Sequence, residues 1–235
     1  MRLSTLLLFC LLLGHTYGQT FSYPQLPERA YEDSLFVPKH WKILKSVEGD
    51  LNRDGKDDIA FVIQYKDSVK LVKSDDDNND TVTTQPRIFA IAFYDATKHD
   101  YKLVIQNSTF ILNHDNPYRD DPFDDLSITN GVLSIDFHLW FSWGTYEMSK
   151  TSYKFRYQNY IFELIGADSY SLHRATGETE TRSYNFMTSR VKTTVGNMSV
   201  DTKTTTWRKL PITELKNIWT IKAPFNYEVE KGFFL

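Results

Sequence analysis

The 235-residue chain carries 27 Lys and Arg against 30 Asp and Glu, which gives a formal net charge of −3 at pH 7. It has no basic excess of the kind that binds phosphate backbones, so we expect no nucleic-acid partner. Aromatic residues make up 15% of the sequence, and a chain of this length can bury a substantial hydrophobic core without disulfides.

The N-terminus has the three parts of a secretory signal peptide. Arg2 precedes an apolar run over residues 6–13 that is too short to span a bilayer, and small side chains follow at positions 16 and 18. We expect cleavage of residues 1–18 and export to the periplasm or the extracellular space. The single cysteine, Cys10, lies inside the apolar run behind bulky neighbours, so lipid attachment there is the less favoured alternative.

After the signal peptide, three prolines within residues 19–38 predict an extended N-terminal arm. Residues 39–235 are expected to form a single β-rich domain. Within it, continuous apolar runs at residues 59–63 and 88–94 indicate strands that are covered on both faces. No later apolar run is long enough to span a membrane, and we expect a monomer.

The dipeptide Asn130-Gly131 predicts a β-hairpin, because both residues tolerate the positive φ of a type I′ turn. Apolar residues then alternate as far as Trp143, so Phe141 and Trp143 are expected in the core. The hairpin would place two apolar pairs on one face: Ile128 opposite Leu133 and Leu126 opposite Ile135.

Further elements follow towards the C-terminus. Residues 183–186 and 191–195 predict a strand pair, and residues 212–219 a short helix. The fold class expected from these patterns is all-β, an antiparallel meander that is partly propeller-like or sandwich-like. A second hairpin is predicted with its loop at positions 158 and 159, which would create two cross-strand pairs: Phe155 with Phe162 and Lys154 with Glu163.

The segment 50–58 carries oxygen-bearing side chains at alternate positions, a glycine at the sixth position and a carboxylate at the ninth. Ca²⁺ takes six to eight oxygen ligands, and a loop that curls around the ion turns alternate side chains inward. Gly55 permits this curl because it has no Cβ. An ordinary turn rich in Asp and Asn is the alternative. The expected ligands are the side chains of Asp50, Asn52, Asp54 and Asp58 and the backbone carbonyl of Lys56.

This loop does not fit the EF-hand formula, because Phe61 occupies the twelfth position and a strand follows. Residues 49–63 instead resemble the D-x-N-x-D-G-x-x-D loop of the FG-GAP/VCBS family, the integrin-alpha-type calcium loop. Over residues 36–210 the chain is also similar to bacterial secreted proteins of this family that carry one such loop and have no characterised function. The resemblance implies calcium binding and export, and it implies no catalytic activity.

Two other acidic segments are weaker candidates for a second ion. Asp75, Asp77 and Asn79 repeat the alternate spacing but lack the glycine and the following strand, so a solvated loop is preferred. A second group could bind a cation or a basic partner, although an ordinary polar loop is again preferred; its members are Asp115, Asp120, Asp121, Asp124 and Asp125.

Asp136, His138 and Trp140 alternate on the face opposite the apolar one, and they are the candidate ligand-binding residues outside the loop. An exposed sheet surface explains this trio equally well. We expect an exported calcium-binding β-domain, a binding, interaction or structural module of the cell envelope, with a glycan or an envelope protein as partner. The alternative is a glycan-acting hydrolase with calcium as scaffold and its acids among residues 120–125 or at Asp136.

Overall fold

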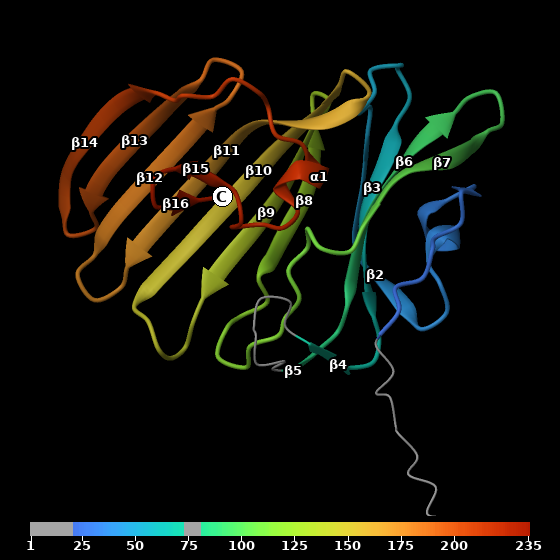
Figure 1. Cartoon of the computed structure of the whole chain (residues 1–235), viewed down its shortest axis with the longest axis horizontal. Helices are drawn as coiled ribbons and strands as arrows, with labels where there is room; N and C mark the ends of the chain where they lie inside the picture. The colour runs from blue at the N-terminus through green and yellow to red at the C-terminus, as the bar shows by residue number, and fades with distance from the viewer. Residues whose placement is uncertain (1–20, 73–80) are drawn as a thin grey trace, which may run out of the picture.

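The computed structural model describes residues 21–72 and 81–235 and shows an all-β, sandwich-like protein built from antiparallel sheets (Figure 1). The expected signal peptide and the acidic segment with Asp75, Asp77 and Asn79 lie outside these residues. In the part of the chain that is described, no helix is long and apolar enough to cross a membrane.

The N-terminal half forms a five-stranded sheet. Its central strands carry the two apolar runs, and residues 59–63 and 88–92 are buried throughout, which confirms that these strands are covered on both faces. The strand order is β1 (Arg29–Ala30), β7 (Asp100–Asn107), β6 (Arg87–Asp95), β3 (Asp58–Tyr65) and β2 (Trp41–Gly49).

The C-terminal half forms a seven-stranded meander, the long curved sheet in Figure 1. Each strand pairs with the next strand in sequence, so the strands follow one another across the sheet in chain order. The strands are β8 (Phe123–Thr129), β9 (Val132–Trp140), β10 (Glu147–Gln158), β11 (Ile161–His173), β12 (Glu178–Asn185), β13 (Arg190–Asn197) and β14 (Val200–Lys209).

Short elements complete the fold. The helix bounds predicted from the sequence, residues 212–219, are wrong, because α1 covers only Ile218–Ile221. Asn217 fixes its start by accepting hydrogen bonds from the backbone N–H groups of Trp219 and Thr220. The remaining elements are the 3₁₀ helix η1 (Asp33–Phe36) and the hairpins β4 (Val69–Val72) with β5 (Thr81–Thr84) and β15 (Glu228–Glu230) with β16 (Phe233–Phe234).

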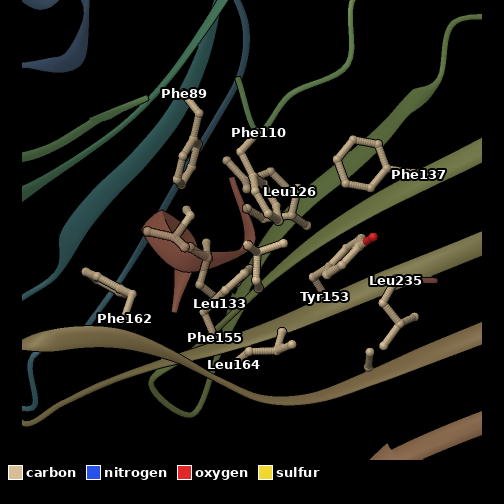
Figure 2. Close-up of a cluster of buried hydrophobic side chains, with 14 of the residues drawn as sticks. Phe89, Phe110, Leu126, Leu133, Phe137, Tyr153, Phe155, Phe162, Leu164 and Leu235 are labelled. Carbon is tan, nitrogen blue, oxygen red and sulfur yellow. The ribbon is translucent and has the colours of Figure 1, made fainter. Parts of the chain in front are cut away.

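Two hydrophobic cores lie on opposite faces of the five-stranded sheet. One core packs this sheet against the seven-stranded sheet and the C-terminal segment, and Figure 2 shows Phe110, Phe137 and Tyr153 among its side chains. The other core lies between the five-stranded sheet and the N-terminal residues, where Leu26 and Phe36 are buried. Residues 21–38 therefore cover one face of the sheet.

The Asn130-Gly131 hairpin has the predicted register. Asn130 and Gly131 have φ values of 52° and 71°, as a type I′ turn requires. The predicted pairs, Ile128 with Leu133 and Leu126 with Ile135, are both present.

The second hairpin turns one residue later than predicted, so its register is wrong. Asn159 and Tyr160 form the turn, with φ values of 54° and 62°. The strands are thereby displaced by two residues, which preserves the face on which each side chain lies. Phe155 is opposite Leu164, Tyr157 is opposite Phe162 and Arg156 is opposite Glu163. The predicted pairing of the strands around residues 183–186 and 191–195 is confirmed in β12 and β13.

The edge strands of the two sheets, β2 and β8, approach closely at Gly49. A Cβ atom at this position would lie 2.6 Å from Cγ2 of Ile128. Such a distance is shorter than any ordinary contact, so only glycine allows this approach. The loop that follows Gly49 therefore begins at the junction of the two sheets.

Candidate functional site

The candidate metal-binding loop, residues 50–57, connects β2 to β3 at that junction. Leu51 is fully buried and belongs to the core between the sheets. The loop then turns outward through positive φ values at Arg53 and Gly55. Across the junction, Gly131 of the β8–β9 turn lies so close that a Cβ there would be 3.3 Å from the carbonyl oxygen of Asp50.

Three of the predicted ligands converge inside the loop. The backbone N–H of Asp54 donates to Oδ1 of Asp50 at 3.1 Å and to Oδ1 of Asn52 at 2.9 Å. Asp54 in turn accepts from the backbone N–H of Lys56 at 2.9 Å. Each of these oxygens has a second lone pair. The three side chains are half-buried or exposed, so a cation from solvent can reach them.

Asp58 has a different role in the structure. Its carboxylate is fully buried; Oδ2 accepts from the backbone N–H groups of Leu51 and Asn52, and Oδ1 from that of Tyr94. Three of about four lone-pair directions are therefore used within the protein. Burial raises the pKa of Asp58 to about 6, although the three N–H donors oppose this rise. Asp58 fixes the loop to the sheet.

The oxygen atoms of the loop therefore match the ligand preference of a hard cation only in part. Asp50, Asn52 and Asp54 supply oxygens, and the Lys56 carbonyl follows at the next alternate position of the exposed loop. Within residues 21–72 and 81–235, no group of three or more His, Cys, Asp or Glu side chains is arranged to hold a metal ion. The loop would depend on the amide of Asn52 and on backbone oxygen as well as on its carboxylates.

Asp136, His138 and Trp140 lie on β9 and face away from the core, all of them half-buried. Among the described residues, Oδ1 of Asp136 and Nε2 of His138 are buried without a hydrogen-bond partner. Burial raises the pKa of Asp136, and Asp125 on the neighbouring strand adds to this rise. One face of the Trp140 ring is covered by the guanidinium of Arg174, 4.9 Å from the ring centre.

Most carboxylates of the 115–125 cluster are paired with basic side chains. Asp121 contacts the buried Arg87 at 2.5 Å. The other pairs are Asp115 with Arg119, Asp125 with Lys45 and Asp124 with Lys150, at 2.7, 2.6 and 3.8 Å. Asp120 is exposed, and its backbone N–H donates to the carbonyl of Trp140. These pairs spread the acidic charge over the sheet and leave no concentrated cation site.

The expectation that Phe141 and Trp143 lie in the core is wrong. Phe141 is half-buried and belongs to neither core. The Trp143 side chain is 73% exposed, because β9 ends at Trp140 and side chains alternate between the two faces of a sheet only within a strand. Trp143 instead lies beside Tyr118 from a separate loop, with 5.7 Å between the ring centres. Sequence reasoning missed Tyr118 and Arg174, which lie far from Trp143 along the chain and carry no motif.

No family model matches the chain, and neither the curated proteins nor the solved structures contain a match to it.

Proposed function

We propose that the protein is an exported calcium-binding β-domain that acts as a binding or structural module of the cell envelope. The observation that supports this most strongly is the clustering of three side chains in the loop: Asp50 and Asn52 both accept from the backbone N–H of Asp54, and the Asn52 amide donates to the Asp54 carboxylate. The resemblance of this loop to FG-GAP/VCBS calcium loops and the signal-peptide pattern of residues 1–18 favour the same proposal.

In this proposal the ion stabilises the junction of the two sheets. Asp50 and Asp54 bring negative charges together in one short loop, and a divalent cation would relieve their repulsion. Since Leu51 and Asp58 anchor the same loop in the core, ordering its exposed part would also fix β2 against the β8–β9 turn. Lys56 would contribute its carbonyl, and Asp58 would act as a positioning residue.

The binding site can be tested by following the amide chemical shifts of residues 19–235 during a calcium titration. We expect shifts confined to the loop and its contacts at Tyr94 and Gly131, with a dissociation constant of about 10⁻⁴–10⁻³ M. Asp54→Ala should abolish them. Asp57→Ala is the matched control, because Asp57 is exposed in the same loop and is not a predicted ligand. Shifts scattered over the acidic surface, or none, would refute the calcium site.

The alternative, a glycan-acting hydrolase, is favoured by one observation. Asp136 combines a raised pKa with an unpartnered buried oxygen, and Asp125 lies opposite it on the next strand. A carboxyl with a raised pKa beside a second carboxylate is the kind of pair that glycosidases use. Reducing-sugar release from a polysaccharide panel that disappears in Asp136→Asn and persists in Asp201→Asn, on the exposed strand β14, would favour this alternative.

A further inference from the structure

A small hollow lies at the end of β9 opposite the candidate metal-binding loop. The loop follows β2 at one end of the sheets, whereas the β9–β10 connection lies at the other end (Figure 1). The hollow lies where this connection meets the loop before β8. It has a volume of about 280 Å³. Sites for drug-sized ligands have volumes of about 300–1,000 Å³, so this one suits a single ring. It is lined by Asn116, Tyr118, Phe141, Trp143, Gly144 and Thr145.

Two aromatic rings stand open to solvent at this hollow. Tyr118 and Trp143 are 54% and 73% exposed, and their planes are tilted by 49°. Large aromatic side chains lose hydrophobic stabilisation when they remain in water, so two of them together on one exposed hollow indicate a contact surface. Tyr146, 64% exposed, is a further aromatic residue of the same connection, and its ring lies beside His173.

Hydrogen bonds hold the two loops around the hollow in place, and two of these bonds come from Arg174. Arg174 donates from Nη2 to the carbonyls of Phe141 and Thr145, both at 2.7 Å, while its guanidinium stacks on Trp140. The second loop is attached through Ser142, whose backbone N–H donates to the carbonyl of Tyr118 at 2.8 Å. A site held in place before binding loses less conformational entropy when a ligand arrives.

The chemistry of the lining selects the class of ligand. No charged side chain is among the described residues that line the hollow. Asn116 uses its carbonyl oxygen within its own loop, which leaves the amide N–H groups as donors, and Thr145 keeps its hydroxyl proton. We infer that this hollow binds one ring of a neutral carbohydrate. The apolar C–H face of a sugar would lie on the aromatic rings and its hydroxyl groups would meet the polar rim.

Other ligand classes fit less well. A cationic ligand would have no carboxylate in the lining and would approach the guanidinium of Arg174. The inference deepens the proposed role as a binding module. It does not depend on the candidate metal-binding loop, which lies at the other end of β9. Failure of calcium binding and failure of carbohydrate binding are therefore separate results.

The test is native affinity electrophoresis of residues 19–235 in gels that contain hydroxyethyl cellulose, galactomannan, laminarin or arabinoxylan, with anionic alginate as a fifth probe. At least one neutral polysaccharide should retard the protein. Trp143→Ala and Tyr118→Ala should weaken that retardation by about tenfold, the effect of losing one well-placed aromatic contact. Trp207→Ala, which removes a similarly exposed tryptophan from β14, should leave it unchanged.

Three results would overturn the inference. They are migration unaffected by all four neutral probes, retardation by alginate alone, and equal weakening in Trp143→Ala and Trp207→Ala. Because Trp143 is exposed, its variant should retain the wild-type melting temperature, which separates loss of binding from loss of fold.

Discussion

Oδ1 of Asp58 accepts a hydrogen bond from the backbone N–H of Tyr94 at 3.0 Å, and this contact joins the candidate metal-binding loop to β6 across 36 residues of sequence. The other oxygen of the same carboxylate holds the backbone of Leu51 and Asn52. One buried side chain thus fixes the start of the loop, β3 and β6 relative to one another.

The first prediction concerns this anchor. Asp58→Ala would leave three N–H groups without their acceptor, and each buried unpaired donor costs about 1–3 kcal/mol. We expect the free energy of unfolding, measured with urea, to fall by about 3 kcal/mol or more. Asp57→Ala removes the same charge from an exposed neighbour and should change stability by less than about 0.5 kcal/mol. Equal effects of the two substitutions would show that Asp58 is not an anchor.

The second prediction concerns the junction of the sheets. Gly49→Ala would place a methyl group 2.6 Å from Cγ2 of Ile128, and such overpacking destabilises by about 1–3 kcal/mol. Ile128→Ala removes that atom, so the double variant should be more stable than the sum of the single effects predicts. Purely additive effects in the double-mutant cycle would mean that the close approach does not exist.

The third prediction concerns acid stability. Burial alone would raise the pKa of Asp121, but the hydrogen bonds and charge of Arg87 outweigh it and lower the pKa below its ordinary value. Because the folded pKa lies below the unfolded one, the pair stabilises the protein above about pH 4 and loses this contribution as the pH falls through the folded pKa.

Asp121→Asn should therefore lower the melting temperature at pH 7, and its difference from the wild type should shrink below about pH 4. Protonation of Asp121 would also leave the buried Arg87 without its anionic partner, with only the neutral acceptors Gln64 and Leu112 remaining. Asp120→Asn, an exposed neighbour, is the control and should follow the wild type throughout. A difference that stays constant with pH would exclude this ion pair as the cause.

The sequence predicted those parts of the fold that depend on local chemistry. The Asn130-Gly131 turn sets its register because both residues adopt positive φ at little cost. The hairpin at residues 158–163 has no glycine, and Tyr160 accepts a positive φ only because the strands on either side are long and well paired. Sequence alone could not show which residue would accept that strain.

The sequence predicted where the candidate site lies better than it predicted the role of each residue in it. Regular spacing identified the 50–58 loop, but the use of the Asp58 carboxylate to bind the backbone of β6 as well as that of the loop depends on how distant strands meet. The same holds for Trp143, because its position beyond the end of β9 and beside Tyr118 is set by tertiary contacts. Alternation predicts burial only within a strand.

Thermal melting of residues 19–235 tests most directly our proposal that the loop at Asp50, Asn52 and Asp54 binds calcium and stabilises the fold. A ligand that binds only the folded state at a hundredfold excess over its dissociation constant adds about 2.7 kcal/mol. For a domain of this size we expect the melting temperature to rise by about 5–10 °C from excess chelator to saturating calcium. Asp54→Ala should remove this rise and Asp57→Ala should retain it. An unchanged melting temperature in calcium, or the same rise in Asp54→Ala as in the wild type, would contradict this proposal.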